Sequence, residues 1–138
     1  MTGILLVTHG GFSKGILEAM ELICGRQENV EALSLNISDD VETLADQVKS
    51  RVQAMNQGCG VLILVDMLGG SPANVSARLM MEDGVACITG LNFPMVLEAV
   101  GSRESCPLSE LVTLCMESGA AGIVDLKARL REFTAQVT

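Results

Sequence analysis

Short runs of consecutive aliphatic residues, which alternate with longer stretches of helical periodicity, constrain the fold of this chain most strongly. The clearest run is Val61–Val65, five aliphatic residues that are followed by Asp66. A continuous run of this length is typical of a parallel strand that is buried on both faces of a sheet. Comparable runs span residues 3–7 and 85–89, and residues 30–37 alternate between apolar and polar side chains.

Apolar residues at helical spacing fill the segments between these predicted strands. Four rounds of strand and helix predict an α/β fold with a small, doubly wound and mostly parallel sheet of about four strands and helices on both faces. We also expect a short fifth strand at residues 123–126 and a tail helix from about Lys127. All of these elements are expected to form a single domain, residues 1–138.

The composition excludes several classes of function. Aromatic residues make up 2% of the chain, with no Trp or Tyr, and the formal net charge is -8. An acidic chain without aromatic stacking platforms is a poor candidate for binding nucleic acid. No apolar run approaches the ~20 residues of a membrane span, and the five cysteines form no CxxC pair that would hold zinc. We therefore expect a cytoplasmic protein with no nucleic-acid partner, no membrane insertion, no metal and no cofactor.

Two polar residues follow predicted strands directly. His9, the one histidine in the chain, follows the first strand, and Asp66 follows the third. In open α/β sheets, ligands bind at the carboxyl ends of the strands, so both side chains are candidates for a site there. A carboxylate that accepts the N–H of one ring nitrogen fixes the tautomer and leaves the other nitrogen as a nucleophile. Taken singly, His9 could equally be a polar residue that starts a loop, and Asp66 could be a helix cap.

Gly69, Gly70 and Ser71 form a candidate anion-binding turn before Pro72. Glycines let the backbone approach a phosphate closely, and a helix N-terminus supplies unpaired N–H groups, to which a serine hydroxyl adds a donor. Alone, the tripeptide is better explained as a Gly-rich turn with a serine cap. Together with His9 and Asp66 it predicts a nucleophile, its orienting group and a phosphate cradle, and hence transient phosphorylation of His9. The Walker A and GxGxxG motifs of competing chemistries are absent, and Ser71 does not lie in the GxSxG motif of a hydrolase nucleophile.

Three segments together resemble the mannose-type enzyme IIA family of the bacterial sugar phosphotransferase system. They are ILLVTHG at residues 4–10, VLILVDMLGGSPAN at residues 61–74 and GLNFPM at residues 90–95. The resemblance extends from residue 1 to about residue 126. It implies a small doubly wound fold and a homodimer in which a C-terminal strand, here residues 122–126, crosses to the partner subunit.

The same resemblance implies a function. His9 would receive a phosphoryl group from the histidine-containing phosphocarrier protein and pass it to enzyme IIB. Asp66 would hydrogen-bond the ring so that Nε2 is the phosphorylated atom, and Ser71 would bind phosphate oxygens. Because a labile phosphoramidate must be protected from water, we expect an apolar rim that also docks the partner. Its candidate residues are Phe12, Met67, Leu68, Leu91 and Phe93.

Two other functions remain open on the sequence alone. A regulatory relay of the same family would use phosphorylated His9 to control a transcription factor or a kinase, and the sequence does not separate this function from sugar transport. A non-catalytic anion-binding module would use the turn at Ser71. Its ligand binding would survive the loss of His9, whereas the phosphorylation expected of a carrier would not.

Overall fold

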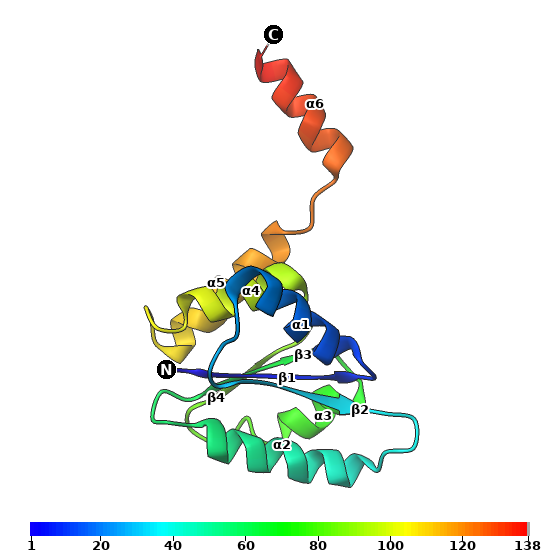
Figure 1. Ribbon diagram of the computed structural model, residues 1–138, viewed down its shortest axis with the longest axis vertical. Coiled ribbons are helices and arrows are strands. Elements are labelled where there is room, and N and C mark those ends of the chain that lie inside the picture. The colour runs from blue at the N-terminus through cyan, green and yellow to red at the C-terminus, as the bar shows by residue number, and fades with distance from the viewer. Residues whose placement is uncertain (138) are drawn as a thin grey trace.

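The computed structural model describes residues 1–137, which form an α/β fold around a four-stranded sheet (Figure 1). The strands lie in the order β2-β1-β3-β4, and every neighbouring pair is parallel. The predicted doubly wound parallel architecture is therefore confirmed. The strands are β1 (Gly3–His9), β2 (Val30–Leu35), β3 (Val61–Val65) and β4 (Val85–Ile88).

Helices cover both faces of the sheet (Figure 1). On one face lie α1 (Phe12–Cys24), α4 (Phe93–Ser102) and α5 (Leu108–Ala121), and on the other lie α2 (Val41–Met55) and α3 (Ser71–Ala77). Successive side chains of a strand point to opposite faces, so β1 and β3 divide their aliphatic residues between two apolar cores. Leu6 and Leu64, for example, belong to one core, and Val7 and Val65 belong to the other.

Polar side chains begin two of the helices at defined positions. The side chain of Asp40 accepts the N–H of Glu42 at 3.2 Å at the start of α2, and Asn92 accepts the N–H of Met95 at 3.0 Å at the start of α4. Each bond satisfies a backbone donor that the first turn of a helix leaves unpaired. Asn92 also donates to the carbonyl of Gly119 at 2.9 Å, which ties the start of α4 to the end of α5.

Arg103, directly after α4, is buried at the amino ends of β1 and β2. Its guanidinium donates to the carbonyl oxygens of Thr2 at 3.3 Å, Glu28 at 2.7 Å and Asn29 at 3.3 Å. These bonds tie the end of α4 to the start of β1 and to the segment that precedes β2. They lie at the edge of the sheet opposite to the carboxyl ends of the strands.

The fifth strand expected at residues 123–126, within the segment expected to cross to a partner subunit, is absent from the described residues. Residues 123–125 have no regular structure, and α6 (Leu126–Val137) begins where the strand was expected to end. A strand needs a neighbour that satisfies its backbone groups. This segment instead projects away from the sheet, with Ile123 and Val124 exposed (Figure 1).

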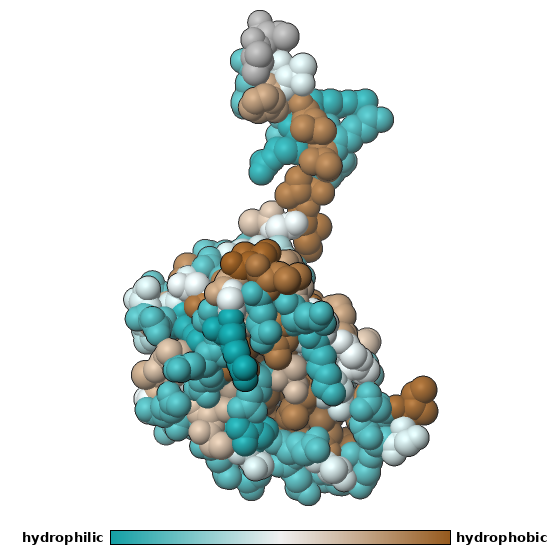
Figure 2. Space-filling model, in the orientation of Figure 1, coloured by the Kyte–Doolittle hydropathy of each residue, from teal (hydrophilic) through white to brown (hydrophobic). Residues whose placement is uncertain are grey.

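Helix α6 also projects from the body of the molecule (Figure 1). Its apolar residues Leu126, Leu130 and Phe133 recur at spacings of four and three, which places them on one side of the helix. All three are exposed, and Figure 2 shows apolar side chains along the connecting segment and α6. Neither α6 nor any other helix in residues 1–137 is long and apolar enough to cross a membrane.

Candidate functional site

The strand order places the two candidate polar residues next to each other. The chain leaves β1 for β2 through α1 on one face of the sheet and reaches β3 through α2 on the other face (Figure 1). The carboxyl ends of β1 and β3 therefore border the point where the winding reverses, which is where such sheets bind ligands. His9 is the last residue of β1, and Asp66 follows the last residue of β3.

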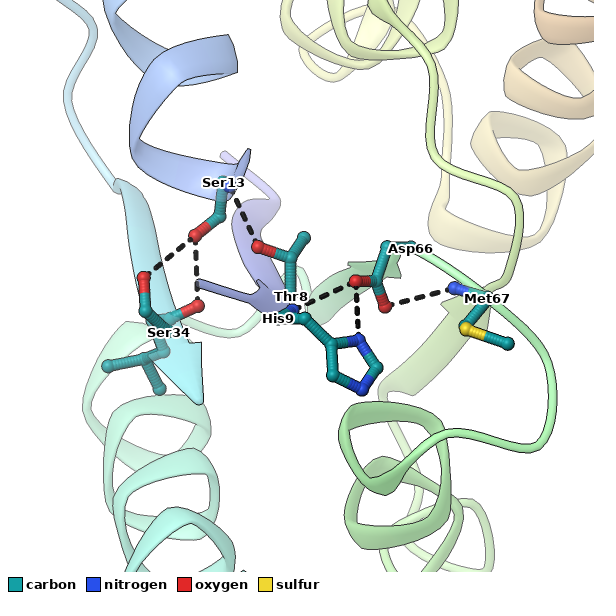
Figure 3. Close-up of polar contacts among 7 residues, drawn as sticks. Thr8, His9, Ser13, Ser34, Asp66 and Met67 are labelled. Carbon is teal, nitrogen blue, oxygen red and sulfur yellow. Dashed lines mark hydrogen bonds and ion pairs between the residues drawn. The ribbon is translucent and has the colours of Figure 1, made fainter. Parts of the chain in front are cut away.

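Asp66 holds His9 through one carboxylate oxygen (Figure 3). Its Oδ2 accepts the backbone N–H of His9 at 2.8 Å and lies 2.7 Å from the ring Nδ1. The other oxygen, Oδ1, accepts the N–H of Met67 at 3.0 Å. The His9 side chain is 48% exposed and the Asp66 side chain 15%, so the ring is accessible from solvent while the carboxylate is largely covered.

The electrostatics of this pair determine which ring nitrogen of His9 carries the proton. Burial acts to raise the pKa of Asp66, but hydrogen bonds from the backbone and ring of His9 and from the N–H of Met67 outweigh burial and hold the pKa below its usual value. The ionised carboxylate only accepts hydrogen bonds, so the imidazole proton lies on Nδ1. Nε2 then carries a lone pair and lies on the side of the ring away from Asp66 (Figure 3).

Thr8 and Ser13 fix the turn that follows His9, a role that sequence analysis missed. The buried hydroxyl of Thr8 accepts the N–H of Ser13 at 2.8 Å in the first turn of α1. The hydroxyl of Ser13 in turn donates to the carbonyl of Leu33 in β2 at 2.9 Å (Figure 3). The backbone of His9 is thus held by β1 before it and by the capped start of α1 after it. The sequence carries no clear signal for this role, because the bonds join β1, α1 and β2.

Gly70 lies against the imidazole of His9. A Cβ atom at this position would be 2.8 Å from Cε1 of His9 and 3.4 Å from Nε2, so a residue without a side chain is required for this close approach. Gly69, with a φ of +86°, has the backbone conformation that glycine favours. Gly70 occupies the N-cap position of α3, and Ser71 is the first helical residue rather than the cap. The predicted anion-binding turn therefore begins beside the ring of His9.

The five apolar residues expected at the rim have different environments. Phe12, Met67 and Leu68 are exposed in the segments that follow β1 and β3. Phe93 is half-buried and packs against the core. Leu91 is only 5% exposed and belongs to that core, because its N–H bonds to the carbonyl of Val65 and holds it under the sheet edge. Leu91 is therefore not available to contact a partner.

Ile37 is an exposed apolar residue near His9 that the sequence analysis placed at the end of a strand. β2 ends at Leu35, and residues 36–39 close a turn. The Asp39 carboxylate accepts the N–H of Asn36 at 2.7 Å, and the N–H of Asp39 donates to the carbonyl of Asn36 at 3.0 Å. This turn leaves Ile37 fully exposed, at 105%. The polar residues on both sides of Ile37 were the available sequence signal for a turn.

Metal ligation has no candidate residues in the described chain. Within residues 1–137, no group of three or more His, Cys, Asp and Glu side chains is placed to hold a metal ion. The imidazole and the carboxylate of the site contact each other instead.

Comparison with known protein families identifies the family to which this chain belongs. Residues 3–116 match the family model described as PTS system fructose IIA component. The chain belongs to the mannose-type enzyme IIA family. The matched residues run from β1 into α5 and include His9, Asp66 and the turn at Gly70.

The relatives of this chain include longer proteins and proteins whose structures have been solved. The mannose-specific EIIAB component of Escherichia coli (strain K12) is 34% identical over 128 residues, which are 91% of this chain and 40% of that protein. The chain thus spans less than half the length of that relative.

Two solved structures have the same fold over almost their whole length. The phosphotransferase system component EIIA from Streptococcus agalactiae has a TM-score of 0.86 and 33% identity, covering 93% of this chain and 99% of that one. The PTS IIA protein associated with the fucose utilization operon of Streptococcus pneumoniae has a TM-score of 0.81 and 30% identity, covering 94% and 96%.

Proposed function

We propose that this enzyme IIA is a cytoplasmic phosphocarrier that becomes phosphorylated on Nε2 of His9. It accepts the phosphoryl group from the histidine-containing phosphocarrier protein and passes it to a sugar-specific enzyme IIB. The observation that carries the proposal is the 2.7 Å contact between Nδ1 of His9 and Oδ2 of Asp66. This contact favours one tautomer, in which the unprotonated Nε2 belongs to an accessible ring.

The transfer step requires a neutral nitrogen nucleophile and compensation of charge. The lone pair of Nε2 attacks phosphorus in line, the P–N bond to the carrier's imidazole breaks, and the electron pair of that bond returns to the carrier's ring. The Nδ1 proton of His9 stays hydrogen-bonded to Asp66, whose negative charge offsets the positive charge of the phosphorylated ring. Transfer to enzyme IIB repeats the exchange with His9 as the donor.

We assign the phosphate oxygens to the turn of Gly69, Gly70 and Ser71. Because a side chain on Gly70 would collide with the His9 ring, a phosphoryl group on Nε2 would lie next to the backbone of this turn. Backbone N–H groups and the Ser71 hydroxyl are donors that suit phosphate oxygens. A positioned set of donors stabilises the charge that develops during transfer.

We further assign two surfaces to protein partners. The exposed residues Phe12, Met67 and Leu68 form the apolar rim that docks the carrier and enzyme IIB, and Phe93 lies at the margin of this rim.

The second surface is the C-terminal segment. Its exposed apolar residues, such as Ile123 and Leu130, are covered by a second copy of the chain in a homodimer.

The test is transfer of labelled phosphate from phosphoenolpyruvate through the upstream carriers onto this protein. We expect one acid-labile, base-stable phosphate on the parent protein and no label on His9→Ala. Label that persists on His9→Ala would contradict the proposal. If the parent takes no label, and if the parent and His9→Ala bind inorganic phosphate equally well, the protein is an anion-binding module instead.

A further inference from the structure

Among the side chains that the structure describes, Ile37 is the most exposed large apolar one, and a fixed turn presents it to solvent. The two hydrogen bonds between Asn36 and Asp39 close the turn around it. The next residue, Asp40, caps α2. Because the backbone of the turn exposes Ile37 to solvent, its side chain contributes nothing to the core. The apolar surface of this side chain is therefore available to a partner.

The turn of Ile37 lies beside the reactive ring. Leu35 is the register partner of His9 in the parallel sheet, and its carbonyl accepts the N–H of Gly10 at 2.8 Å. A shallow, mostly apolar hollow connects the ring to the turn and is lined by His9, Gly10 and residues 35–39. Figure 2 shows apolar side chains that protrude at the edge of the body where β1 and β2 end in Figure 1.

The ring is therefore flanked by apolar side chains from two loops. Ile37 stands on the β2 side, and the exposed Met67 and Leu68 stand on the β3 side. A protein that brings its own phosphorylated imidazole in line with Nε2 must cover the surface on both sides of the ring. The hollow and Ile37 are then part of the surface that the donor buries.

We propose that Ile37 is a docking anchor for the phosphocarrier protein, a role that rests on the proposed function of His9. Its side chain packs on an apolar patch of the carrier next to the carrier's phosphorylated histidine. The exposed carboxylates of Asp39 and Asp40 flank the anchor, so the matching patch carries basic side chains at its border. The occupant of the hollow is thus an apolar and basic face of a protein, and the anchor acts on docking rather than on the chemistry of the ring.

The test compares two phosphoryl donors on the variant Ile37→Ser. The first donor is the phosphorylated carrier protein, and the second is phosphoramidate, a small molecule that needs no docking surface. We expect the second-order rate constant with the carrier to fall about tenfold, as is typical when an interface anchor is truncated. Labelling by phosphoramidate is expected to keep the parent rate, and Ile37→Leu to restore most of the transfer from the carrier.

Leu22→Ser is the matched control. Leu22 is also highly exposed, at 86%, but it lies near the end of α1, the helix that begins beside the site and runs away from it. We expect this variant to match the parent with both donors. Ile37→Ser that accepts phosphate from the carrier at the parent rate would overturn the inference, as would an equal loss with both donors. Failure of both donors to label His9 in the parent would instead refute the proposed function.

Discussion

At the scale of single residues, the site depends on one carboxylate oxygen that serves two donors. Oδ2 of Asp66 accepts both the backbone N–H and the ring Nδ1–H of His9, so it fixes the position and the tautomer of the imidazole together. Oδ1 is engaged by the N–H of Met67, which prevents the carboxylate from rotating freely. An uncharged amide in place of Asp66 keeps the shape of this arrangement and loses its charge.

Asp66→Asn is therefore expected to fold and to be phosphorylated more slowly. The charged hydrogen bond that it loses is worth roughly 1.5–3 kcal/mol, which corresponds to about a 10- to 160-fold slower transfer. Labelling by phosphoramidate measures the effect without a contribution from docking. Equal rates for Asp66→Asn and the parent would show that the carboxylate has no part in the reaction.

The Asp66→Asn variant also tests how the unfolding free energy depends on pH. Because the folded protein lowers the pKa of Asp66, the ionised group stabilises the fold at pH values above its ordinary pKa of 3.8. That contribution is lost as the pH falls through the lower pKa of the folded state. The difference in unfolding free energy between parent and Asp66→Asn should persist above pH 3.8 and should shrink as the pH falls below it. Urea titrations across this range measure it, and a difference that grows on acidification would contradict it.

Gly70→Ala tests the close approach of the loop to the ring. The backbone of Gly70 has φ -84° and ψ 166°, which any residue adopts, so the fold should tolerate alanine. Its methyl group, however, would meet Cε1 of His9 at 2.8 Å and displace the ring from Asp66. We expect labelling by phosphoramidate to fall at least about tenfold, since small displacements at a reacting centre are costly. Gly11→Ala is the control because its methyl group meets nothing within 4 Å, and an equal loss in both variants would refute the steric account.

At the scale of elements, the sequence predicted the four strands and the residues at their ends. The prediction failed for segments whose structure depends on whether they pair with a neighbouring strand. His9 and Asp66 were predictable because each follows an aliphatic run at the binding edge of a parallel sheet. Ile37 and residues 123–126 have the composition of strands, but one lies in a turn closed by Asp39 and the other has no neighbouring strand. The contacts of Thr8 and Gly70 arise from tertiary packing, which no local pattern encodes.

Arg103 is expected to stabilise the end of the sheet that lies away from the site. Arg103→Met would remove the guanidinium donor from the carbonyls of Thr2, Glu28 and Asn29, of which Asn29 would keep the N–H of Ile4, at a cost of about 2–4 kcal/mol in unfolding free energy. Urea denaturation measures this loss, and phosphoramidate labelling of His9 should be unchanged. The control is Arg78→Met, whose ion pair with Glu42 is exposed. A loss no greater than that of the control would contradict the proposed clamp.

At the scale of the whole molecule, the C-terminal segment carries a group of exposed apolar side chains. Ile123, Leu126, Leu130 and Phe133 are all exposed, and burying such residues in a homodimer would remove apolar surface from water. We expect the parent chain to sediment as a dimer and a chain that stops after Gly122 to sediment as a folded monomer. A parent that stays monomeric at about 100 μM, far above the dissociation constant of a specific dimer, would contradict this expectation.

The position of the phosphoryl group on the ring tests the account most directly. The chain contains one histidine, so NMR of the phosphorylated protein with ¹⁵N-labelled histidine reports on His9 without ambiguity. We predict ³¹P coupling to Nε2, with the proton retained on Nδ1 and its hydrogen bond to Asp66 intact. Phosphorus coupled to Nδ1, or a stable phosphate on any other residue, would contradict the account.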